Sequence, residues 1–166
     1  MYAGRPFMDP LLKILRHHAR TPIADLAREL SISEDAVAER IARLEQEGVI
    51  LGYLAVLDAQ KALGTLVTAV VEVKITPERG GGFDRLAARI ANFAEVQSCY
   101  LMSGGYDLLV VVEGRNLQEI ASFIAEKLST IKGVISTATH FRLKAYKESG
   151  VSLTQMEKPE RLAVTP

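Results

Sequence analysis

Side chains able to catalyse reactions or bind metal ions are present in this chain, but their spacing fits no common active site. The three histidines, His17, His18 and His140, have no cysteine pair at a spacing suited to zinc. The glycine run at 80–82 is not followed by Lys-Ser/Thr, so we interpret it as a connection and not as a phosphate-binding loop. Serine-hydrolase and zinc-protease motifs do not occur. The sequence therefore predicts a binding protein, not an enzyme, with no metal and no cofactor.

The turn at 103–107 has the groups that a small zwitterion needs. The backbone N–H groups of its two glycines suit a carboxylate, and the carboxylate of Asp107 suits an ammonium group. Two threonines alternate on one face of a later strand and can add hydroxyl groups. In the alternative interpretation, Asp107 only ends a structural turn and the threonines reflect strand propensity. The candidate effector-binding residues are Gly104, Gly105, Tyr106, Asp107, Thr137 and Thr139.

A helix that begins after Ser33 offers a second candidate surface. At 100° per residue, Val37, Ile41 and Leu44 form its buried stripe. In a helix-turn-helix, the opposite face would enter the major groove of DNA, where small alanines allow close approach and arginine contacts phosphate or guanine. In the alternative interpretation, this face is the solvated side of a small helical bundle. The candidate DNA-contacting residues are Ser33, Asp35, Ala38, Glu39, Arg40, Ala42 and Arg43.

The charge of this region is unusual for a surface that binds phosphate. Residues 1–52 contain seven basic and eight acidic side chains, which leaves a formal charge of −1. Phosphate binding draws on clustered lysine and arginine. We therefore expect one copy to bind DNA weakly and several copies together to supply the affinity.

Start and stop signals predict three short helices that hold this surface. Asp9-Pro10, Thr21-Pro22 and Ser33 each precede an apolar stripe with helical spacing, and Gly48 ends the third. Two short helices joined by a few residues are typical of a helix-turn-helix. Extended chain follows at 49–57, and a polar segment at 58–64 is expected to be a hinge.

The rest of the chain alternates between strand and helix periods. Strands are predicted at 67–75, 96–102, 108–112 and 134–146. One helix begins near Phe83, and a second begins at Asn116, where Glu119 three residues later completes a capping pattern. The order β-α-β-β-α-β predicts a ferredoxin-like domain, so the fold class is α+β. Residues 148–166 are expected to form a loosely packed tail.

Composition excludes several classes of protein. The 166 residues are 48% hydrophobic and carry 20 basic and 20 acidic side chains, which argues against a polycation and against disorder. The single cysteine, Cys99, excludes a disulfide framework and is expected to be a buried small side chain. No signal peptide or membrane span is expected, because the longest apolar run is Leu108–Val112. These features favour a cytoplasmic protein.

The chain resembles the Lrp/AsnC transcriptional regulators in both halves. The first half of the resemblance rests on the segments 23–27 (IADLA), 30–33 (LSIS) and 48–53 (GVILGY), and the second on 102–108 (MSGGYDL) and 133–139 (GVISTAT). The resemblance implies a winged helix-turn-helix joined by a strand to a ferredoxin-like effector-binding domain. It also implies binding of double-stranded DNA, and dimers that pair through their sheets and assemble into tetramers or octamers. The turn at 104–107 and the strand with Thr137 and Thr139 would lie near an amino-acid site between subunits.

The domain boundaries that follow are 1–52 for the winged helix-turn-helix, 53–64 for the strand and hinge, 65–147 for the effector-binding domain and 148–166 for the tail. Members of the family often carry basic residues early in the recognition helix, where this chain has Glu34, Asp35 and Glu39. This departure keeps open an amino-acid sensor that contacts a protein and not DNA. A third alternative is an enzyme similar to the siroheme decarboxylases, although the chain lacks an Arg-Arg-Phe-Gly-like segment and His140 is the one histidine in its second domain.

Overall fold

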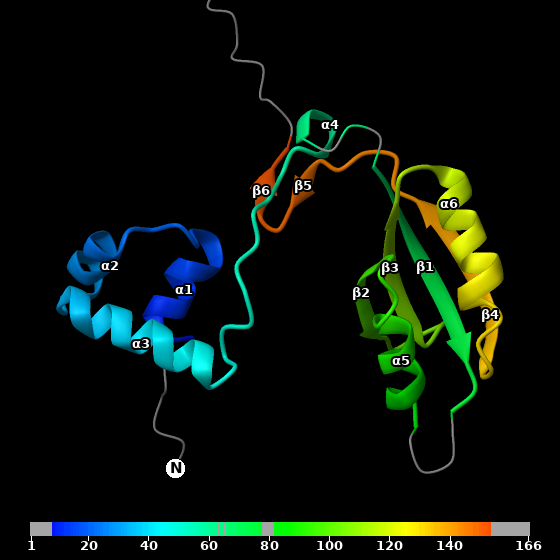
Figure 1. Ribbon diagram of the computed structural model, residues 1–166, viewed down its shortest axis with the longest axis horizontal. Helices are drawn as coiled ribbons and strands as arrows, with labels where there is room; N and C mark the ends of the chain where they lie inside the picture. Colours follow the sequence, from blue (N-terminus) through cyan, green and yellow to red (C-terminus); the bar gives the residue numbers. More distant parts are fainter. Residues whose placement is uncertain (1–7, 63, 65, 78–81, 154–166) are drawn as a thin grey trace, which may run out of the picture. The chain divides into compact units, whose positions relative to one another are not determined.

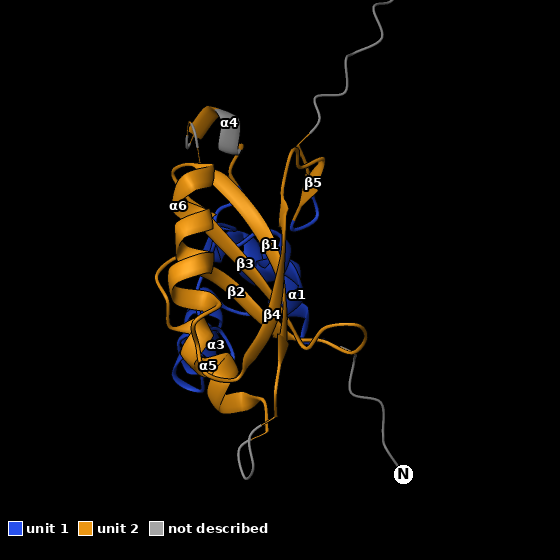
Figure 2. Ribbon diagram, turned by 90° about the vertical axis from the view of Figure 1, so that its right-hand side faces the viewer, with its two compact units in different colours: residues 1–56, 149–151 blue, residues 57–148, 152–166 orange. Residues whose placement is uncertain are grey.

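The structure is a computed structural model that describes residues 8–62, 64, 66–77 and 82–153 (Figure 1). The chain forms two compact units, residues 1–56 with 149–151 and residues 57–148 with 152–166 (Figure 2). Helices make up the first unit and an antiparallel sheet with helices makes up the second, so the predicted α+β class is confirmed. Among the described residues, no helix is long and apolar enough to cross a membrane.

The N-terminal unit contains α1 (Pro10–His17), α2 (Ile23–Leu30) and α3 (Glu34–Gln46). Two of the predicted caps are confirmed, because Asp9 accepts a hydrogen bond from the Leu11 N–H at 2.9 Å and Ser33 accepts one from the Ala36 N–H at 3.2 Å. The third start signal is shifted by one residue. Pro22 is the N-cap of α2, and the Thr21 hydroxyl instead donates to the His18 carbonyl.

The three helices enclose one small apolar core. Leu11, Leu26 and Val37 are at most 1% exposed, and one comes from each helix. The turn between α2 and α3 is tight because Ser31 adopts the left-handed conformation, with φ of 55°. This packing and turn give the predicted helix-turn-helix.

The chain that leaves α3 is extended. Gly48, with φ of 68°, ends the helix as predicted. Residues 51–58 form no paired strand within the described part of the chain. The segment predicted as a hinge contains a single helical turn, α4 (Ala59–Ala62).

The second unit is built on a four-stranded antiparallel sheet. Its elements are β1 (Val67–Ile75), α5 (Asp84–Ala91), β2 (Val96–Leu101), β3 (Leu108–Gly114), α6 (Leu117–Ser122), the π-helical segment η1 (Phe123–Leu128) and β4 (Val134–Phe141). The strand order is β2-β3-β1-β4. This is the predicted ferredoxin-like arrangement.

The helices α5 and α6 form one layer, which covers a single face of the sheet (Figure 2). Val71, Val73, Val110 and Val112 point into this layer and are fully buried beneath the helices. The predicted cap of α6 is confirmed, because Asn116 Oδ1 accepts from the Glu119 N–H at 2.8 Å. The other face of the sheet is left open.

The last predicted strand is too long. β4 ends at Phe141, not at residue 146, because Phe141 already pairs with Ala69 near the start of β1 and Arg142 makes the last backbone bond to that strand. The predicted tail also begins with structure. A short hairpin, β5 (Lys147–Glu148) and β6 (Val151–Ser152), follows β4, and residues 154–166 lie outside the described residues, as does most of the glycine run at 80–82.

Candidate nucleic-acid and effector sites

The outward face of α3 is accessible along its length. Ala38 and Ala42 are exposed, and the Arg43 side chain is 65% exposed, with its Nε 3.9 Å from Glu47 Oε1. Such a long and exposed ion pair contributes little and leaves Arg43 available to a partner. The Ser33 hydroxyl accepts from the Ala36 N–H and so acts as a helix cap.

Arg40 lies on the flank of α3 and contacts the start of α1. Its Nη2 donates to Asp9 Oδ2 at 2.7 Å, and both side chains are partly buried. Asp9 thus caps α1 and also neutralises a charge on α3. The sequence placed Arg40 with the DNA-contacting residues and missed this pair, because the two residues are 31 positions apart.

Acidic side chains dominate the first two turns of α3. Glu34, Asp35 and Glu39 are all exposed, and the first two lie where the helix dipole favours negative charge. They stabilise the helix but repel phosphate. A shallow hollow of about 330 Å³ lies beside them and is lined by Ile32, Ala36, Glu39, Arg40 and Arg43.

Asp107 ties the predicted effector turn to the neighbouring strand. Its Oδ2 accepts from the Ile75 N–H at 2.8 Å, and its own N–H donates to the Val73 carbonyl at 3.0 Å. The pairing of β1 with β3 ends at Val73 and Leu108, and the Asp107 side chain bonds the Ile75 N–H just beyond that last pair. Asp107 therefore bonds another strand, a role that neither sequence interpretation included.

The rest of the turn is open to a ligand. Gly104 and Gly105 are exposed, and their N–H groups have no hydrogen-bond partner among the described residues. Gly104 has φ of 134°, which favours glycine at that position. Tyr106 is half-buried beside them.

The two candidate threonines lie on the edge strand β4. Thr137 pairs with Val73 and Thr139 with Val71, so both share the helix-covered face of the sheet. The Thr137 hydroxyl lies 3.3 Å from that of Ser129. Because Val73 also pairs with Leu108, the turn at 103–107 and Thr137 lie at the same end of the sheet, two strands apart.

Cys99 is less buried than the sequence predicted. It is partly buried on the helix-covered face, and its thiol lies 3.9 Å from the Ala87 carbonyl. Burial raises the pKa of this thiol, which disfavours the reactive thiolate. No group of histidine, cysteine or carboxylate side chains in the described part of the chain is arranged to hold a metal ion.

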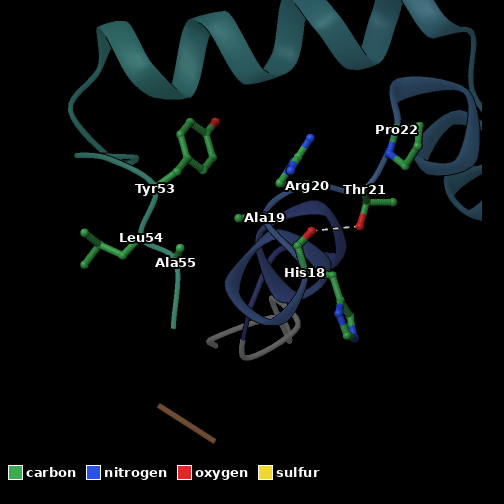
Figure 3. Close-up of a pocket in the computed structure, with 8 residues that line it drawn as sticks. All are labelled: His18, Ala19, Arg20, Thr21, Pro22, Tyr53, Leu54 and Ala55. Carbon is green, nitrogen blue, oxygen red and sulfur yellow. Dashed lines mark hydrogen bonds between the residues drawn. The ribbon is translucent and has the colours of Figure 1, made fainter. Parts of the chain in front are cut away.

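The N-terminal unit also has an open hollow of about 820 Å³ (Figure 3). The connection between α1 and α2 forms one wall, where Thr21 bonds the His18 carbonyl, and the extended segment at 53–55 forms the other. Its lining is mostly apolar and contains none of the predicted site residues. No pattern in the sequence predicts this hollow, since its two walls are about 30 residues apart along the chain.

A helix-turn-helix with an accessible second helix, followed along the chain by a ferredoxin-like sheet domain, is an arrangement typical of DNA-binding regulators. Residues 10–45 match the AsnC-type helix-turn-helix domain, and residues 68–152 match the Lrp/AsnC ligand binding domain. The chain belongs to the Lrp/AsnC family of transcriptional regulators.

Relatives support this assignment over most of the chain. An uncharacterized HTH-type transcriptional regulator of Bacillus subtilis, YugG, is 43% identical over 157 residues, which cover 94% of this chain and 95% of that protein. A proline dehydrogenase transcriptional activator of Rhodobacter capsulatus is 33% identical, with 83% of this chain and 89% of the relative covered. The prediction that the chain is not an enzyme is confirmed by these relatives, which are named as regulators.

Solved structures agree with the fold. A feast or famine regulatory protein of Mycobacterium tuberculosis, complexed with L-methionine, has a TM-score of 0.67 and 27% identity, with 83% of this chain and 90% of that chain covered. A transcriptional regulator of Neisseria meningitidis, also in complex with L-methionine, has a TM-score of 0.69 and 22% identity, with 87% of this chain and 95% of that chain covered.

Proposed function

We propose that this regulator binds specific sequences of double-stranded DNA through α3 and responds to a free amino acid or a related small metabolite. We also propose that the domains have the limits predicted from the sequence and that the protein is located in the cytoplasm. The observation that carries it is the accessible α3 surface, where two alanines leave room beside Arg43.

The geometry of α3 supports contact with bases. Val37 and Leu44 are buried against the other helices, so the opposite side of α3 faces outward from the unit. Side chains on this side of a second helix reach the major groove in helix-turn-helix proteins. Arginine donates to guanine O6 and N7 in a paired geometry, and Arg43 is the exposed arginine on this side.

Replacing Arg43 tests this assignment. Arg43→Ala is expected to weaken binding to an operator fragment by about 1–3 kcal/mol if the contact is to a base. Fluorescence anisotropy measures the affinity, with a fragment of the gene's own upstream DNA. Arg28→Ala is the matched control, because Arg28 is an exposed arginine on α2 in an i,i+3 pair with Asp25. Equal affinity of the folded Arg43→Ala protein and the wild type would contradict the assignment.

The effector part of the proposal rests on the turn at 103–107. The N–H groups of Gly104 and Gly105, which have no partner among the described residues, suit a carboxylate, and the second carboxylate oxygen of Asp107 suits an ammonium group. Two regulators of similar fold are described as complexes with L-methionine. Tyr106, Thr137 and Thr139 would shape the rest of the site, which we propose to be completed by a second subunit.

Self-association follows from the open face of the sheet. Val70, Leu109 and Val111 lie on this face and are only partly buried, and the Tyr100 side chain beside them is 53% exposed. Apolar side chains on an uncovered sheet face favour a covering layer. A two-fold pair of sheets is the simplest cover, and larger assemblies such as tetramers or octamers would place several α3 helices on one DNA.

A further inference from the structure

A chain of polar contacts joins the start of β1 to the residue that follows β4. Thr68 is 4% exposed, and its hydroxyl accepts from Arg142 Nη2 at 2.8 Å. The same hydroxyl donates to Glu113 Oε1 at 3.4 Å, and Arg142 Nη1 donates to Glu148 Oε2 at 3.0 Å. These contacts hold the guanidinium in one orientation, because each partner lies on a different element of the same unit.

A hollow of about 160 Å³ lies beside this guanidinium. The chain turns back after β4, where the Leu153 N–H donates to the Tyr146 carbonyl at 3.0 Å and brings the end of the described chain over the start of β1. We call this hollow the Arg142 pocket. It is lined by Asp58, Leu66, Thr68, Arg142, Leu143, Lys144, Ala145 and Leu153.

The pocket has spare hydrogen-bond donors and two cations. Arginine has five side-chain N–H donors, and two of those of Arg142 are used. The other three have no partner among the described residues. Lys144 Nζ lies 5.0 Å from the centre of the Tyr146 ring and has no carboxylate within 4.0 Å in the described part of the chain. Asp58, which pairs with Lys61 at 3.3 Å, is the one carboxylate in the lining.

The size of the pocket limits what fits. Water occupies about 30 Å³ per molecule in the liquid, so the volume equals roughly five waters. Pockets for drug-sized ligands begin at about 300 Å³. The Arg142 pocket therefore suits a molecule of about six non-hydrogen atoms, the size of a three-carbon acid.

We propose that the Arg142 pocket binds a small metabolite through a single carboxylate, at a site separate from the turn at 103–107. The planar guanidinium presents paired donors that match the two oxygens of a carboxylate, and Lys144 adds a second positive charge. A second carboxylate on the ligand would face Asp58, so the site favours monocarboxylates. Both simple acids and amino acids share this chemistry, and an α-ammonium group would find a partner in Asp58.

Calorimetry with the full chain tests this site. The probes are pyruvate and L-alanine, which have the same three-carbon skeleton and differ in the group on the α carbon. We expect saturable binding of at least one probe, weakened about tenfold by Lys144→Gln, the loss expected for one charge-assisted contact. Lys132→Gln is the matched control, because Lys132 is an exposed lysine elsewhere in the same unit.

A second variant separates charge from geometry. Arg142→Lys keeps the positive charge and removes the paired donors, so we expect binding to weaken at least as much as with Lys144→Gln. Circular dichroism shows whether Arg142→Lys unfolds the unit. If it does, the affinity of the Lys144→Gln protein alone tests whether the Arg142 pocket binds the probes. Stronger binding of L-alanine identifies an amino acid as the ligand, and stronger binding of pyruvate identifies a simple acid.

Three results would overturn the proposal. They are no binding of either probe, unchanged affinity in the folded Lys144→Gln protein, and loss of binding in Asp107→Asn. The last result would place the ligand at the turn at 103–107. Failure of DNA binding or of the effector turn leaves these measurements unaffected, so the two proposals fail independently.

Discussion

At the scale of single residues, Asp107 combines two roles: its carboxylate accepts a structural hydrogen bond from β1, and we propose that it also contacts the ammonium group of the ligand. Its Oδ2 holds the Ile75 N–H, while the charge on the carboxylate is what an ammonium group would contact. A substitution that keeps the acceptor and removes the charge separates the two roles.

Asp107→Asn is that substitution. The asparagine Oδ1 can still accept from Ile75, so we expect a small change in melting temperature and a clear loss of affinity for the amino acid. Calorimetry measures the affinity for L-methionine or another amino acid that stabilises the wild type in a thermal-shift screen. Unchanged affinity in the variant would show that the ammonium group contacts a residue other than Asp107.

Glu95 gives a prediction that depends on pH. Its Oε1 accepts from Lys127 Nζ at 2.6 Å, and this bond lowers the pKa of Glu95 below its ordinary value. A carboxyl group whose pKa is lower in the folded state stabilises the fold above its unfolded pKa, and this contribution is lost as the pH falls through the folded pKa.

We therefore expect Glu95→Gln to lower the melting temperature at pH 7, and to lower it less at an acidic pH below the ordinary pKa of a glutamate. Thermal unfolding followed by circular dichroism measures both. Glu126→Gln is the control, because Glu126 is exposed and its carboxylate has no ion pair in the described part of the chain. An equal deficit at both pH values would show that the bond acts through packing and not through charge.

These residue contacts mark the limit of what the sequence predicts. Asp9 and Ser33 were correctly predicted as caps, because a cap contacts residues two or three positions away. The Asp9–Arg40 pair and the Asp107–Ile75 bond were missed, because each joins residues more than 30 positions apart and depends on how elements pack. Contacts between a site residue and a distant part of the chain were thus not predictable from sequence spacing.

At the scale of elements, the junction between η1 and β4 depends on one glycine. Gly133 has φ of 101°, and its carbonyl accepts from the Thr76 N–H at 2.8 Å. A Cβ at this position would lie 3.2 Å from Leu86 Cδ2. Both the backbone and the packing therefore disfavour a side chain.

Gly133→Ala is expected to destabilise the second unit by about 1–3 kcal/mol, the typical strain at such a backbone conformation. Urea unfolding measures the change in the free energy of unfolding. Gly105→Ala is the control, since no atom lies within 4 Å of its Cβ position and its φ is not in the left-handed region. Equal stability of the two variants would contradict the strain argument.

The elements also show where local patterns fail. Periodicity predicted every strand of the main sheet, but it extended the last strand to residue 146. Strand length is set by the partner, and β1 begins at Val67, so β4 has no neighbour beyond Arg142, whose N–H bonds the Thr68 carbonyl. The β5–β6 hairpin was missed because its strands are two residues each and carry no periodic pattern.

At the scale of the whole molecule, the proposed assembly depends on the open face of the sheet. Val111 lies at the centre of that face, on β3 between β1 and β2. A charge there would be buried without a partner in a pair of sheets, which costs several kcal/mol.

Val111→Arg is therefore expected to convert an assembly into monomers of 18.2 kDa at micromolar concentration. Sedimentation velocity measures the mass. Ala125→Arg is the control, because Ala125 is exposed on the helical layer that covers the other face of the sheet. A wild type that sediments as a monomer would contradict the assembly itself.

The bond between Thr68 and Arg142 has a consequence for synthesis on the ribosome. It closes the sheet across 74 residues, so β1 emerges long before its edge partner exists. At about 5–20 residues per second, the wait is roughly 4–15 s. The contacts between α1 and α3 span only about half that sequence distance, as the 31 positions between Asp9 and Arg40 show, so the helix-turn-helix can fold first. During that interval the apolar side chains of β1, Val71 and Val73 among them, have no finished sheet to join. The second domain is thus expected to expose apolar strand surface for longer during synthesis than the first.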